Sequence, residues 1–81
     1  MLQAYIPVLI VYQERDDQAD RVITEMIKVI GSDKTITNED FEIYFNFCLV
    51  FTGIETKDYN SLYSLVWDRI NRNVCPITNG A

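Results

Sequence analysis

The sequence predicts an all-α fold, a small bundle of three to four helices built around a helical hairpin. Three observations predict it. Hydrophobic residues recur every three or four positions, single glycines stand where these stretches end, and 48% of the 81 residues are hydrophobic. A chain of this length forms one domain with a small core. We therefore expect a single helical domain over residues 1–75 and a flexible C-terminal tail over residues 76–81.

Two structures compete for the first segment, residues 5–30. Its apolar residues continue at helical spacing, and after Pro7 no Gly, Pro, Asn or Ser interrupts it. The β-branched run Val8–Tyr12 instead favours a strand. We predict a helix from Pro7 towards Ile30, because proline fits a first helical turn and β-branched residues cost only a few tenths of a kcal/mol each in a helix. The alternative is an α+β fold with an N-terminal strand at residues 5–12.

The second helix is predicted over residues 38–52. Thr37 is a candidate N-cap with Asp40 three residues later, and Gly53 can end the helix. From Phe41 onwards this helix is apolar on nearly every side, so it needs cover on nearly every side. We expect a central core helix, and cover by a second chain is the alternative for the side that the other helices leave open.

The last helix is predicted from about Asp58 to Asn73, where apolar residues at helical spacing form one core face. Tyr59, Tyr63 and Trp67 follow one another at intervals of four along it. We expect them to pack in the core. Tyrosine and tryptophan are also the commonest anchors of protein interfaces, which makes Tyr63 and Trp67 candidate partner contacts.

The charge distribution excludes several classes of partner. The net charge is −5, and nine of the twelve acidic residues lie in residues 1–45, so no basic stripe is available for a phosphate backbone. The apolar run that ends at Gln13 is shorter than the roughly 20 residues of a membrane span. No basic side chain precedes Arg15 and no small-residue cleavage site follows, unlike in an export signal. We expect a cytoplasmic protein that binds neither nucleic acid directly nor a membrane.

Residues that commonly carry catalysis are also missing. The chain has no histidine, its glycines are isolated, and two cysteines, Cys48 and Cys75, cannot form a zinc site by themselves. We expect no enzyme activity, no cofactor and no bound metal. The cysteines are expected to be free thiols, with a bridge between them left open as an alternative.

These exclusions favour a protein that acts by contact. We expect a non-enzymatic protein that regulates or inhibits a larger, basic or nucleic-acid-binding protein, a role typical of phages and mobile elements. The alternative is a self-associating structural or assembly subunit, and we expect a homodimer. Antiparallel helices would divide the acidic candidates into two patches. The candidate contact residues are Asp16, Asp17, Asp20, Glu39, Asp40, Glu42, Tyr63 and Trp67.

Overall fold

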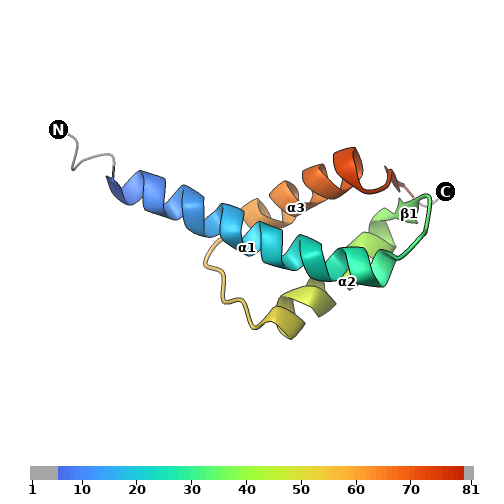
Figure 1. Ribbon diagram of the computed structural model, residues 1–81, viewed down its shortest axis with the longest axis horizontal. Helices are drawn as coiled ribbons and strands as arrows, with labels where there is room; N and C mark the ends of the chain where they lie inside the picture. The colour runs from blue at the N-terminus through green and yellow to red at the C-terminus, as the bar shows by residue number, and fades with distance from the viewer. Residues whose placement is uncertain (1–5, 80–81) are drawn as a thin grey trace.

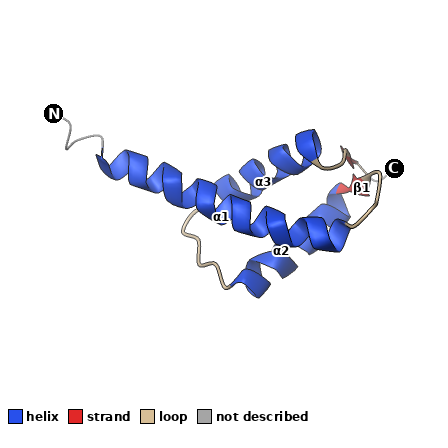
Figure 2. Ribbon diagram, viewed as in Figure 1, coloured by secondary structure: helices blue, strands red, loops and turns tan. Residues whose placement is uncertain are grey.

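The computed structural model describes residues 6–79, and their side chains from residue 14 onwards. Over these residues three helices pack against one another: α1 (Ile6–Ile30), α2 (Asn38–Thr52) and α3 (Tyr59–Asn73) (Figure 1). Two very short strands, β1 (Ile36–Thr37) and β2 (Ile77–Thr78), form a parallel pair beside them (Figure 2). The predicted all-α helical bundle is confirmed.

Helix α1 settles the conflict over the first segment. Residues 6–12 are helical, so the alternative of a strand at residues 5–12 is wrong for them, and Tyr5 lies outside the described residues. Helical spacing without a turn outweighed the β-propensity of the run. The 25 residues of α1 span about 37 Å, and its first turns extend past α2 and α3 (Figure 1). The helix ends at Ile30. The next residue, Gly31, has a left-handed φ of 64°, and its N–H donates to the Ile27 carbonyl at 2.9 Å.

Both predicted caps of α2 are confirmed. The Thr37 hydroxyl accepts a hydrogen bond from the Asp40 N–H at 3.0 Å. At the other end Gly53 has a φ of 69°, and the Ile54 N–H reaches back to the Leu49 carbonyl at 3.4 Å. This is the Schellman arrangement that a glycine after a helix favours.

Helix α3 begins at Tyr59, directly after its N-cap Asp58. One Asp58 carboxylate oxygen accepts from the Ser61 N–H at 3.1 Å and the other from the Ser61 hydroxyl at 2.6 Å. These hydrogen bonds stabilise the ionised carboxylate and so lower the pKa of Asp58. The local sequence thus fixes where the loop after α2 turns into α3.

The segment after α3 is tied back to the start of α2. The Ile36 N–H donates to the Pro76 carbonyl at 3.1 Å, and the Ile77 N–H donates to the Asn71 side chain at 2.9 Å. The Asn38 amide donates to Asn79 at 2.8 Å. Residues 76–79, which the sequence assigns to a flexible tail, are therefore hydrogen-bonded to the helical body through partners that no local pattern reveals.

The core lies where the three helices meet, and every helix contributes side chains to it. No polar or charged side chain of the described residues is fully buried there. Within residues 6–79 no helix is long and apolar enough to cross a membrane. The buried residues are Ala19, Val22, Met26, Ile30, Ile36, Phe41, Phe45, Cys48, Leu62, Val66, Ile70 and Cys75.

Candidate protein-contact surface

Helix α2 has an apolar side that the rest of the fold leaves uncovered. Its inward side carries Phe41, Phe45 and Cys48, which are buried. Its opposite side carries four large apolar residues that are 57–82% exposed. Their spacing of four, three and one places them along one stripe of the helix. We call this stripe the outer face of α2; it consists of Ile43, Phe47, Val50 and Phe51.

An aromatic cluster between α2 and α3 fixes which side of α2 faces inward. The Phe45 ring meets the rings of Tyr59 and Tyr63 edge-on, with centroid distances of 5.5 and 5.2 Å. Phe41 meets Tyr63 in the same manner at 5.1 Å. Edge-to-face packing of this kind is directional, so it sets the rotation of α2 about its axis. The outer face is exposed because the aromatic cluster occupies the other side.

The outer face is continuous. The rings of Phe47 and Phe51 stack with centroids 6.3 Å apart and planes at 14°. With the exposed side chains of Ile43 and Val50, the stripe offers about 500 Å² of apolar surface, if a full aromatic side chain presents about 200 Å². The largest patches of monomeric proteins are about this size and are often functional.

The two ends of the outer face carry opposite charges. Asp40 stands one heptad before Phe47, and therefore on the same side of α2, close to its N-terminus. At the other end the Arg21 guanidinium of α1 donates to the Thr52 carbonyl, the last residue of α2, at 3.0 Å. Arg21 and Phe51 both line a shallow hollow of about 300 Å³ between α1 and α2. An acid thus marks the start of the face and a base marks its end.

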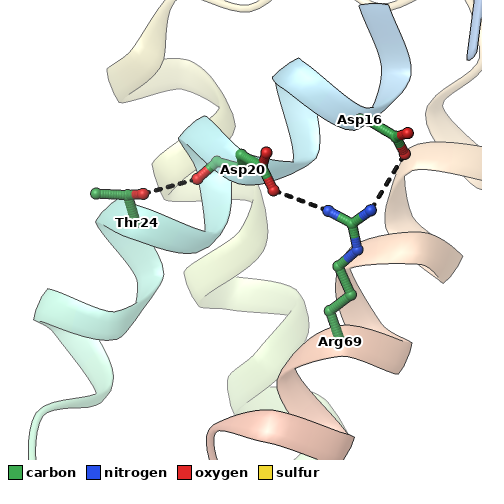
Figure 3. A network of polar contacts seen from close by, with 4 residues as sticks. All are labelled: Asp16, Asp20, Thr24 and Arg69. Carbon is green, nitrogen blue, oxygen red and sulfur yellow. Dashed lines mark hydrogen bonds and ion pairs between the residues drawn. The ribbon is translucent and has the colours of Figure 1, made fainter. Parts of the chain in front are cut away.

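The acidic residues on α1 are partly used within the chain. Arg69 of α3 bridges two of them, with nitrogen–oxygen distances of 3.1 Å to Asp16 and 2.8 Å to Asp20 (Figure 3). The Thr24 hydroxyl donates to the backbone carbonyl of Asp20 at 2.8 Å. Of the three acidic candidates on this helix, only Asp17 has no ion pair within the described residues.

The acidic candidates of α2 lie far from that pair. Glu39 and Glu42 are exposed and Asp40 is half-buried, in the part of α2 that follows the α1–α2 loop. Because the loop reverses the chain, these residues lie near the C-terminal end of α1, away from Asp16 (Figure 1). The structure therefore does not bring the six acidic candidates together on one surface.

The two aromatic candidates contribute to the core boundary. Tyr63 is half-buried in the aromatic cluster; burial raises the pKa of its hydroxyl, and the charge of Glu42 raises it further. The Trp67 indole N–H donates to the Asn38 side chain at 3.0 Å. Both line a hollow of about 260 Å³ together with Asn38 and Ser64. Tyr63 and Trp67 are only half-buried, and their contact with a partner stays a prediction.

The remaining candidates for chemistry are the two cysteines. Both are free thiols, and burial raises the pKa of Cys48 and of Cys75, with the carboxylates of Glu25 and Asp33 respectively adding to it. A buried thiol with a raised pKa is a poor nucleophile. Among the described residues no group of three or more acidic, cysteine or histidine side chains is placed to hold a metal ion.

The sequence favours a central core helix for residues 38–52, with cover by a second chain as the alternative. The structure leaves one side of α2 exposed, and the sequence analysis does not select the residues of that side. The signal was available: four apolar residues share one side of the helix, and Phe41, Phe45 and Cys48 share the other. A scan against protein-family models, a search of curated proteins and a search of solved structures find no match to the chain.

Proposed function

We propose that this protein acts without catalysis, by stoichiometric contact with another protein, and that the outer face of α2 is the contact surface. The observation that carries the proposal is the stacked, exposed pair Phe47 and Phe51 at the centre of an apolar stripe. The centres of protein interfaces are enriched in aromatic residues and depleted in charge. Water around two adjacent exposed phenylalanine rings is released when a partner covers them, which drives association.

The first form that this function can take is regulation or inhibition of a larger, basic protein. Asp17, Glu39 and Glu42 are exposed, and the chain carries a net charge of −5. Acidic side chains outside an apolar contact accelerate association with a basic partner and contribute less to affinity itself. The pairing of Asp16 and Asp20 with Arg69 weakens this form of the proposal, because part of the acidic surface is neutralised within the chain.

A second candidate is self-association into a structural or assembly subunit. The opposite charges of Asp40 and Arg21 at the two ends of the outer face favour it, since a second copy offers the complementary pattern. The two candidates are compatible, because a dimer formed through α2 leaves Asp17 available to a further partner.

Site-specific photo-cross-linking tests whether the outer face is a contact surface. A photoreactive phenylalanine analogue at Phe47 should give one cross-linked product of defined mass in cells that express the protein. The matched control carries the same analogue at Asn60, an exposed position on α3. Equal products at both positions, or none at Phe47, would show that the outer face contacts no protein.

A further inference from the structure

We infer that the occupant of the outer face is a second copy of this chain, bound with the two α2 helices antiparallel and with Asp40 of each copy paired to Arg21 of the other. The inference rests on the proposed function, because it takes the outer face to be a contact surface. It adds the partner, the relative direction of the helices and the residues that determine that direction.

The spacing of charges along the face fits a two-fold axis near Phe47. Asp40 lies one heptad, about 10 Å along the helix, before Phe47. The Thr52 carbonyl, to which the Arg21 guanidinium is hydrogen-bonded, lies about 10 Å beyond Phe47. A two-fold rotation about Phe47 therefore brings Asp40 of one copy to the level of Arg21 of the other, and both pairs form at once.

The side on which each charge lies is also compatible. Arg21 belongs to α1, so it flanks the outer face on the α1 side, next to Phe51. A face-to-face antiparallel pair keeps both α1 helices on the same side of the contact, so the flanking charges meet. A parallel pair would instead place the two Asp40 residues at one level and the two Arg21 residues at another, on opposite sides of the contact, so that no Asp40 meets an Arg21.

The available charges are free to make the contact. The Asp40 carboxylate forms no ion pair within the part of the chain that the structure describes. The guanidinium of Arg21 uses one N–H for the Thr52 carbonyl and carries further donors in a fixed fork.

The area is sufficient for a modest dimer. If each copy covers its outer face of about 500 Å², the contact buries about 1,000 Å² in total, near the lower limit of specific interfaces. Apolar residues alone would leave the direction of the helices open, since Ile43, Phe47 and Val50 fit either way. The two charge pairs therefore determine the arrangement.

A charge-exchange experiment tests the inference by sedimentation equilibrium on the full chain, with Asp40→Arg and Arg21→Glu as variants. Each variant alone should dimerise at least tenfold more weakly than wild type, because both contacts of its dimer become repulsive. An equimolar mixture of the two should form a heterodimer with near-wild-type affinity, since both of its contacts are attractive. The controls are Glu42→Arg and Lys34→Glu, which make the same changes of charge away from the outer face. Far-UV circular dichroism confirms that every variant is folded.

Each outcome has a distinct meaning. A wild-type protein that remains monomeric up to millimolar concentration overturns the inference, and the proposed contact function then depends on the cross-link at Phe47. If the wild type dimerises and Phe47→Ser abolishes the dimer, but the mixture does not recover affinity, the outer face is a contact surface and the antiparallel pairing is wrong. A dimer that survives Phe47→Ser contradicts the inference and places self-association elsewhere.

Discussion

Two phenylalanines of α2, two positions apart, should respond to the same substitution in opposite ways. Phe45 is 0% exposed and packs against three other aromatic rings, whereas Phe47 is 60% exposed on the outer face. Phe45→Ala removes a buried ring and leaves a cavity, which costs about 3–5 kcal/mol in protein cores. Phe47→Ala removes a ring that is largely in water, and such surface changes alter the free energy of unfolding by about 0.5 kcal/mol or less.

Urea unfolding followed by circular dichroism measures both effects. For a domain of this size the free energy of unfolding falls by about 1 kcal/mol per molar urea, so Phe45→Ala should lower the midpoint by about 3–5 M and Phe47→Ala by less than about 0.5 M. Since total stabilities are typically about 5–10 kcal/mol, Phe45→Ala brings the chain close to unfolding in water. Both proteins are measured at a few micromolar and over a dilution series, so that association does not add to stability.

Two results with Phe45→Ala and Phe47→Ala would contradict this account. If Phe47→Ala lowers the midpoint as much as Phe45→Ala at every dilution, then Phe47 is buried within the monomer and the outer face does not exist. If Phe45→Ala has no effect, the aromatic cluster does not fix the rotation of α2.

Three further perturbations test other parts of the structure. Gly53→Ala places a side chain on a left-handed residue and should cost about 1 kcal/mol in urea unfolding, although nothing lies within 4 Å; a neutral result would contradict the cap. Arg69→Ala should lower the free energy of unfolding by under about 1 kcal/mol, and by less at high salt, because the carboxylate partners of Arg69 are exposed. A loss above about 2 kcal/mol would contradict the small contribution expected of exposed ion pairs. The pKa of Tyr63 is raised in the folded state, so its protonated hydroxyl stabilises the fold below pH 10, and this stabilisation is lost as the pH rises further. The free energy of unfolding of the wild type should therefore fall more than that of Tyr63→Phe between pH 9 and 11; equal losses would contradict this.

Local sequence patterns predicted most of this fold because the elements are defined by local chemistry. Thr37, Gly31 and Gly53 act at helix ends through hydrogen bonds to neighbours within a few residues, so their spacing is readable in the chain. The first segment was harder, because the β-branched run carries a strand preference that only periodicity over a longer stretch could outweigh.

What the sequence could not predict depends on contacts between distant residues. The attachment of residues 76–79 rests on hydrogen bonds to Ile36 and Asn38, which stand about 40 positions earlier in the chain. The pairing of Arg69 with Asp16 and Asp20 joins residues about 50 positions apart, so the three acidic candidates of α1 read in the sequence as one open patch. The composition of α2 indicates that the helix is apolar on more sides than the other helices can cover. Which side is exposed is determined by Tyr59 and Tyr63 of α3, which pack against Phe45 on the opposite side.

Amide chemical shifts recorded over a concentration series test most directly the claim that the outer face of α2 is where this protein meets another copy of itself. Spectra of the ¹⁵N-labelled chain are compared from about 20 µM to 1 mM, a range that spans dissociation constants typical of small interfaces. We predict shifts that grow with concentration at Ile43, Phe47, Val50 and Phe51 and at the flanking Asp40 and Arg21, while the amides around Arg69 stay unchanged. Shifts centred on Asp16, Asp20 and Arg69, or spectra that do not change with concentration, would contradict the claim.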